Sequence, residues 1–330
     1  MKKLFFLLAC VAMSVLSFGQ DNQLVWANGH LLYGTPIESI DSLTYDEMQD
    51  IDTLHLLLPR TLIKVVHDTV YIHDTVYVET DCGEDTPSSA GIGVFSVSAD
   101  KQVTFSKGNL QYHPTNNKWR FAENQWDYIG AANNNISSSY NDWLDLFGWS
   151  TSATNFGVST STNSNDYSGS FVDWGTNKIG NDAPNTWRTL TYDEWKYLRY
   201  DRTNADDLVG IAQVNGVNGL ILLPDNWTCP SGVTFKSGFH SKWGDDYYAA
   251  YQTFTAEQWS LLESAGAVFL PAAGDRYGSN VGNLQYYGFY WSATGDSNLA
   301  NYLYIRSDIA GMGGNRRYCG NSVRLVKDLQ

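Results

Sequence analysis

The chain has 330 residues, of which 43% are hydrophobic, so it is long enough to bury the core of one large domain or of two smaller ones. Its formal net charge is −14, and it has no cluster of Lys and Arg of the kind that phosphate recognition needs, which argues against nucleic acid and anionic lipid as partners. Only 17% of the residues are charged, whereas 12 are Trp and 21 are Tyr, a composition that favours contact surfaces.

Residues 1–19 have the three-part pattern of a secretory signal peptide. Two lysines precede an apolar run, and a small-residue cleavage site follows at Ser17–Gly19, so the mature chain is expected to begin at Gln20 and to be exported. Leu7–Cys10 has some likeness to a lipoprotein processing site, but cleavage there would leave a very short apolar region, and a lipid anchor is not expected. No other stretch is apolar for long enough to span a bilayer, so a transmembrane protein is not expected.

Residues 20–60 are predicted to form a small β segment, and residues 61–80 an extended stalk. In the first, apolar runs flank Asn28 and Gly29 in LVWANGHLLYG, which predicts a β-hairpin. In the second, VVHDTVYIHDTVYV repeats His-Asp-Thr-Val with a period of six. Because six is even, each repeated residue returns to the same face of a strand. This pattern predicts one extended stretch, through which copies of the chain could associate.

The same repeat offers the residue types of a metal site but not its geometry. In a strand each Asp points away from the adjacent His, and His67 and His73 would lie about 20 Å apart, too far to share one ion. Residues 92–330 contain only two histidines, His113 and His240, which are too few for a His-based zinc site. We therefore expect no metal and no cofactor.

Residues 81–91, DCGEDTPSSAG, are polar and rich in turn formers, which predicts a linker to a main domain over residues 92–330. The main domain opens with two β-branched and aromatic runs around residues 99–102, which predict a hairpin. Later, the apolar runs in VNGVNGLILLPDNW and AVFLPAAG predict buried strands.

Two capping boxes predict the main helices. Thr191 is followed three residues later by Glu194, and Thr255 is followed by Gln258 at the same spacing. Gly266 is placed to end the second helix. Two helices among many short strands and long loops predict an α+β domain.

Three cysteines follow the predicted signal peptide, in a chain expected to reach an oxidising compartment. A disulfide between Cys229 and Cys319 is one alternative, with Cys82 left in the linker. Unpaired thiols are the other alternative, because spacing alone does not establish a pairing.

The segment from 290 to 328 is packed with Asn, Tyr, Ser, Asp and Gly and then closes on the strand-like SVRLV. Tyr provides broad amphipathic contact at low entropic cost, while Ser, Asn and Gly adapt their hydrogen bonds, as in antibody paratopes. The composition predicts surface loops that contact a ligand.

Several motifs of the main domain resemble a known family. WRTLTYDEWKYLRYDR resembles the helix motif of the formylglycine-generating, sulfatase-modifying family, and YWSAT followed by GNSVRLVKD resembles its closing strands. The span from about 93 to 328 is similar to secreted proteins of gut-dwelling Gram-negative bacteria. The resemblance implies a C-type lectin-like fold in a protein that is secreted or displayed on the outer surface of such a bacterium.

Some relatives in that group are variable proteins diversified by retroelements, which substitute at adenines and scatter residues reachable from Asn codons. The resemblance implies a rigid frame that includes Trp291, Leu303 and Val323, with a C-terminal ligand-binding surface. A diversified surface, a fixed binding surface and a purely structural end all remain open. The candidate ligand-binding residues are Asp275, Tyr277, Tyr286, Tyr287, Asp296, Ser297, Asn298, Asn301, Tyr302, Tyr304, Arg306, Asp308, Asn315, Arg316, Tyr318 and Asn321.

Catalysis of the formylglycine-generating kind would need a pair of cysteines near the C-terminus. The chain has one there, Cys319, while Cys229 lies far upstream, and neither has a neighbouring His to activate it. No catalytic residue is therefore assigned. The sequence favours a secreted or surface-displayed protein that binds a protein or glycan ligand through its C-terminal loops; a sulfatase-modifying enzyme and a structural surface protein are the alternatives.

Overall fold

The computed structural model describes residues 23–27, 30–35, 62–66, 69–73, 93–149, 159–296 and 298–329. The chain divides into two compact units, residues 1–87 and residues 88–330. The division lies inside residues 81–91, the predicted linker.

The first unit contains two hairpins. Strands β1 (Gln23–Ala27) and β2 (His30–Thr35) pair antiparallel, which confirms the hairpin predicted there. Strands β3 (Leu62–Val66) and β4 (Thr69–His73) also pair antiparallel. The prediction of one extended stretch is therefore wrong for this segment, since the chain reverses between the two strands. Alternation is the same in one long strand and in two short paired ones, so the repeat could not separate them.

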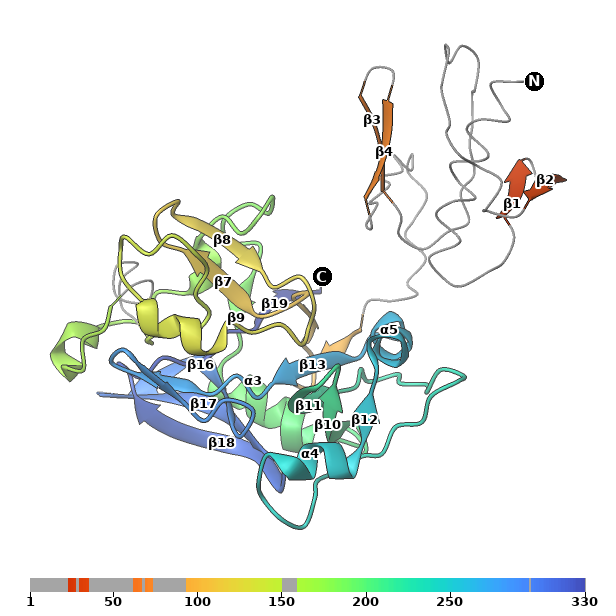
Figure 1. The fold of residues 1–330 in the computed structure, drawn as a ribbon. Helices are drawn as coiled ribbons and strands as arrows, with labels where there is room; N and C mark the ends of the chain where they lie inside the picture. The colour runs from red at the N-terminus through yellow and green to blue at the C-terminus, as the bar shows by residue number, and fades with distance from the viewer. Residues whose placement is uncertain are drawn as a thin grey trace. The chain divides into compact units, whose positions relative to one another are not determined.

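The second unit is a mixed α+β structure, as predicted, and most of its elements are strands (Figure 1). One sheet has the order β12-β10-β11-β13, a second β5-β6-β19-β9, and a third β16-β17-β18. Two further pairs are β7 with β8 and β14 with β15. The strands are β5 (Phe95–Ser96), β6 (Gln102–Phe105), β7 (Leu110–His113), β8 (Lys118–Phe121), β9 (Arg188–Thr189), β10 (Val209–Val214), β11 (Val217–Leu222), β12 (Thr253–Phe254), β13 (Val268–Pro271), β14 (Asp275–Tyr277), β15 (Asn280–Gly282), β16 (Gly288–Asp296), β17 (Leu299–Arg306), β18 (Ile309–Arg316) and β19 (Leu325–Asp328).

The predicted strands and the opening hairpin are confirmed. VNGVNGLILLPDNW contains β11, AVFLPAAG contains β13, and β5 pairs with β6. The helices are α3 (Tyr192–Lys196), which runs on into a π-helical turn η6 (Tyr197–Asp201), α4 (Asp246–Tyr251) and α5 (Ala256–Ser264), with short 3₁₀ turns η3 (Gly130–Asn135), η4 (Ser164–Tyr167) and η5 (Trp174–Thr176).

Both predicted capping boxes are present. The Thr191 hydroxyl accepts from the Glu194 amide at the start of α3, and Thr255 does the same for Gln258 at the start of α5. Each glutamate or glutamine side chain in turn accepts from the amide of its cap residue, at 2.9 Å and 3.0 Å. Gly266, with φ of +93°, follows Ala265, the C-cap of α5.

We expect Thr255→Ala to lower the free energy of unfolding by about 1 kcal/mol, because the Gln258 amide loses its hydroxyl acceptor at the first turn of α5. Chemical denaturation measures the change. Thr255→Ser keeps the acceptor and should recover most of it. Equal losses in the two variants would contradict a capping role.

Candidate ligand-binding site

The sheet β16-β17-β18 has two different faces. Along β17, Leu303 and Ile305 are buried in a core cluster that also contains Trp195 of α3 and Tyr290 of β16. Tyr302 and the residues that alternate with it point to the opposite face. The first face therefore builds this core. The second face packs in part against another core cluster, through Trp291, Ala300 and Tyr302, and its remaining half-buried or exposed residues can carry contacts.

The second face carries a continuous row of aromatic rings, which we call the aromatic face. Trp291 lies beneath it, fully buried, as predicted for a residue of the frame. Its other rings are half-buried or exposed, and they come from three segments: Trp243, Tyr286, Tyr287, Phe289, Tyr302 and Tyr304.

Neighbouring rings of the aromatic face contact one another in sequence. Ring centroids are 5.4 Å apart for Trp243 and Tyr286, and 4.9 Å for Tyr286 and Tyr287. The row continues from Tyr287 to Phe289 at 5.7 Å and from Phe289 to Tyr302 at 5.3 Å. Most of these pairs are edge-to-face, the geometry that aromatic quadrupoles favour. The rings thus stiffen one another.

Two glycines of β18 give the tyrosines room to lie over the sheet. Tyr304 is paired with Gly311 and Tyr302 with Gly313. A Cβ atom added at Gly313 would lie 2.8 Å from the Tyr302 ring, and one at Gly311 would lie 3.1 Å from the Tyr304 hydroxyl. Side chains at these positions would displace the rings.

An ion pair lies at one end of the aromatic face. The Arg306 guanidinium donates to both oxygens of Asp308, at 2.8 Å and 2.7 Å, which raises the pKa of Arg306. The same guanidinium lies 5.6 Å from the centroid of the Trp243 ring. The face therefore offers charged hydrogen-bonding groups beside its rings.

Ser307 holds the loop that carries Trp243 against the turn between β17 and β18. Its hydroxyl accepts from the Gly244 amide at 2.9 Å and donates to the Lys242 carbonyl at 3.1 Å. Its backbone carbonyl accepts from the His240 amide at 2.8 Å. With 53% of its surface exposed, Trp243 is fixed in place and still accessible.

The structure brings only part of the predicted site together. Tyr286, Tyr287, Tyr302, Tyr304 and Arg306 lie on or beside the aromatic face, with Asp308 as the partner of Arg306. The other half-buried or exposed candidates lie elsewhere on the main domain: Asp275, Tyr277, Asp296, Asn298, Asn301, Asn315 and Arg316. Ser297 lies outside the described residues.

Two candidates are buried, and their prediction as ligand-binding residues is wrong. Tyr318 is 7% exposed and packs edge-on against Tyr277, with ring centroids 5.4 Å apart. Asn321 is fully buried, and its backbone exchanges two hydrogen bonds with Phe147. Composition suggested loops, but these bonds hold the segment inside the fold.

Trp243 and Phe289 belong to the aromatic face but were not among the candidates. Phe289 lies two residues after Tyr287. Because side chains two residues apart point to the same face of a strand, strand periodicity could have indicated Phe289. Trp243 lies upstream in SKWGDD, where its only signal is an aromatic residue next to glycine in a polar loop.

The two described cysteines are free, so the disulfide alternative is not the one the structure adopts. Cys229 is exposed, whereas Cys319 is buried, and burial raises the pKa of the Cys319 thiol to about 11.

Among the described residues, no group of three His, Cys, Asp or Glu is placed to hold a metal ion. No helix in this part of the chain is long and apolar enough to cross a membrane.

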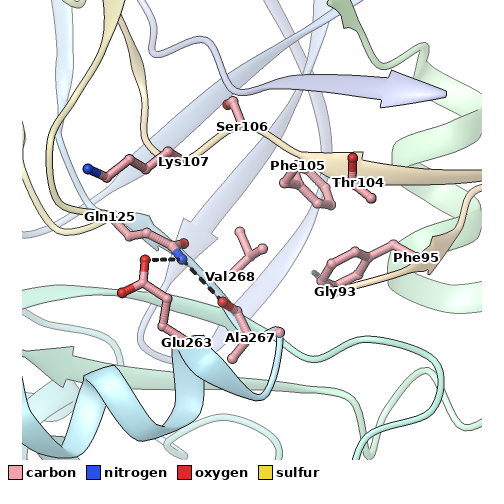
Figure 2. Close-up of a pocket in the computed structure, with 11 residues that line it drawn as sticks. Gly93, Phe95, Thr104, Phe105, Ser106, Lys107, Gln125, Glu263, Ala267 and Val268 are labelled. Carbon is pink, nitrogen blue, oxygen red and sulfur yellow. Dashed lines mark hydrogen bonds between the residues drawn. The ribbon is translucent and has the colours of Figure 1, made fainter. Parts of the chain in front are cut away.

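A small cavity of about 160 Å³ lies between β6 and the end of α5, away from the aromatic face (Figure 2). The Gln125 amide on its wall donates to Glu263 and to the Ala267 carbonyl. Lys107, at the rim, is exposed. The amide of Gln125 is thus already engaged within the fold rather than available to a ligand.

No family model, curated protein or solved structure matches the chain.

Proposed function

We propose that the chain is an exported ligand-binding protein that contacts its ligand through the aromatic face. The observation that carries the proposal is the row of rings from Trp243 to Tyr304, built on a sheet whose other face is in the core. Trp, Tyr and Arg are the residues that most often dominate binding energy. Here all three residue types occur together, and more than half of the surface of Trp243 is exposed.

The aromatic face suits a protein or a glycan ligand. Tyr and Trp rings bury large areas with little loss of side-chain freedom and keep a polar atom for hydrogen bonding. The Arg306–Asp308 pair adds directional donors and acceptors at the same surface. Clustered cations, which a nucleic acid would require, are missing from the described part of this face.

The C-type lectin-like fold, and kinship with retroelement-diversified proteins, are part of the same proposal. They rest on the motif resemblance over residues 93–328 and on the mixed α+β architecture. Tyr304 points away from the side of β17 that carries Leu303 and Ile305, so substitutions at Tyr304 would leave both residues packed, whereas Tyr302 also packs against a second core cluster. Such a sheet could tolerate a changing contact surface.

The sulfatase-modifying alternative requires a reactive thiolate. Cys319 is buried with a raised pKa, so its thiol is protonated at neutral pH. We therefore argue for binding rather than for thiol chemistry.

The test immobilises the full chain and offers two probes, a printed glycan array for glycans and a phage-displayed random peptide library for proteins. We expect selective retention of members of one probe set. In the variant with Trp243→Ala and Tyr304→Ala, affinity for these members should fall at least about tenfold, because both anchors of the face are removed.

Tyr277→Ala is the matched control, since Tyr277 is equally exposed but is not part of the aromatic face. Its binding should match that of the parent chain. Unchanged binding in the double variant, or an equal loss in Tyr277→Ala, would contradict the proposal. Retention on neither probe would favour the structural alternative.

A further inference from the structure

Strand β18 is the outer strand of its sheet, so one of its edges has no neighbouring strand among the described residues (Figure 1). All eight of its residues pair with β17 on the inner side. It contains neither Lys nor Pro, the residues that commonly protect such edges. Such an edge can pair with another strand wherever its outward backbone groups have no partner in the fold.

The register shows which backbone groups face outwards. Arg306 and Ile309 are paired across a two-residue turn, which makes them a hydrogen-bonded pair of the antiparallel ladder. Such pairs alternate with pairs whose amide and carbonyl groups point away from the partner strand. On β18 the outward groups therefore belong to Ala310, Met312, Gly314 and Arg316.

Both ends of this outward row are already occupied. The Ala310 carbonyl accepts from Arg199 Nε at 3.1 Å and from the Tyr200 hydroxyl at 3.3 Å. At the other end, the Arg316 amide donates to Asn315 Oδ1 at 2.8 Å, and its carbonyl accepts from the Cys319 amide at 3.0 Å.

The centre of the row is free. The outward amide and carbonyl groups of Met312 and Gly314 have no hydrogen-bond partner among the described residues. Gly314 is exposed and Met312 is half-buried. Two donors and two acceptors thus lie symmetrically on either side of Gly313.

We propose that β18 pairs with β18 of a second copy of this chain, antiparallel and centred on Gly313. Met312 of each copy then faces Gly314 of the other, and the free groups form about four hydrogen bonds across a two-fold axis. At the centre the Gly313 residues face each other, where the absence of side chains permits the close approach of a non-hydrogen-bonded pair.

Charge favours a second copy over an unrelated strand. Arg316 is exposed and forms no salt bridge within the described part of the chain. The register places it level with Ala310 of the other copy, whose flank carries Tyr200, 45% exposed, and the exposed Asp206, one oxygen of which also pairs with Arg199 at 2.9 Å. Each copy therefore brings an arginine to an aromatic ring and a carboxylate of the other.

The pairing would join the two sheets into one of six strands. Directly opposed residues point to the same face, so the two aromatic faces would lie on one side. The inference goes beyond the proposed function, because the edge groups pair whether or not the face binds a ligand.

The test uses the full chain from Gln20 onwards, without the predicted signal peptide. Sedimentation measures its mass in solution over a range of concentrations. We expect a concentration-dependent dimer for the parent chain, and at least about tenfold weaker dimerisation for Gly314→Pro. Proline removes an outward amide that has no partner inside the fold, a position where edge strands accept it. The unfolding midpoint checks that the variant still folds.

Tyr304→Ala is the matched control, since it alters the aromatic face and leaves the edge intact. It should retain the dimer while losing ligand capture, whereas Gly314→Pro should lose the dimer. The two variants therefore distinguish a failure of the β18 pairing from a failure of ligand binding by the aromatic face. A parent chain that stays monomeric, or a Gly314→Pro variant that dimerises as strongly as the parent, would overturn the pairing.

Hydrogen exchange and a charge swap test the register separately from any association through residues 61–80. Exchange at Met312 and Gly314 should slow as the concentration rises. Arg316→Asp should weaken the dimer, and adding Asp206→Arg should restore it. Exchange independent of concentration, or no restoration by the swap, would count against the proposed register.

Discussion

Gln125→Leu is expected to lower the free energy of unfolding by about 3–5 kcal/mol, because it leaves several buried polar groups unpaired without creating a large cavity. Gln125 lies beside β13, the last strand of its sheet. Its side chain supplies hydrogen bonds that a further strand would otherwise provide.

The contacts of Gln125 (Figure 2) explain the size of this effect. Its Oε1 atom accepts from the Phe269 amide at 2.7 Å and from Arg324 Nη2 at 2.9 Å. Its Nε2 atom donates to the Ala267 carbonyl at 3.2 Å and to Glu263 at 2.9 Å. Arg324 is fully buried, and burial lowers its pKa to about 10, so the loss of an acceptor is costly.

Chemical denaturation of Gln125→Leu and of the exposed control Gln102→Leu measures the effect. The control should change the free energy of unfolding by less than about 0.5 kcal/mol, as surface substitutions usually do. A loss below about 1 kcal/mol for Gln125→Leu would show that water or local rearrangement satisfies the groups left behind.

Local signals account for the elements that the sequence predicts correctly. The capping boxes at Thr191 and Thr255 are complete within four residues, and the apolar runs of β11 and β13 need no knowledge of their neighbours. Helix α4 was not predicted. At its start, Asp245 caps the helix by accepting from the Asp246 amide.

The aromatic face could be predicted only in part because it is assembled by tertiary contacts. Tyr302 and Tyr304 follow from strand alternation, but Trp243 reaches them through the hydrogen bonds of Ser307, which no local pattern reveals. Conversely, Asn321 has the composition of a loop residue, yet its pairing with Phe147 places it in the core. Composition alone therefore does not separate the exposed positions of this segment from the buried ones.

A single buried carboxyl group should make stability depend on pH in an unusual direction. Asp145 is fully buried; one oxygen accepts from Asn133 Nδ2 and the other from the Ile129 amide, both at 2.8 Å. Burial raises the pKa of Asp145 from 3.8 to about 6, and the hydrogen bonds only partly offset it.

Because the folded-state pKa of Asp145 lies above its unfolded value, the folded state binds this proton more tightly. Its contribution to stability is therefore fully present below about pH 4 and is lost as the pH rises through about 6. A shift of about two pKa units corresponds to about 3 kcal/mol. Glu194 and Asp328, whose pKa values are lowered beside Arg188, act in the opposite direction. Their contribution to the stability of the folded protein is lost as the pH falls.

The difference between the parent chain and Asp145→Asn isolates this one group, because the effects of Glu194 and Asp328 are common to both proteins. Asparagine carries a constant cost from its mismatched amide, so the informative quantity is the change with pH. Between pH 4 and pH 7 the parent should lose about 2.4 kcal/mol relative to the variant. The exposed control Asp142→Asn should show no such trend. Parallel stability curves for the parent and Asp145→Asn would mean that the Asn133 and Ile129 donors compensate fully for burial, so that Asp145 stays ionised in the folded protein at little cost.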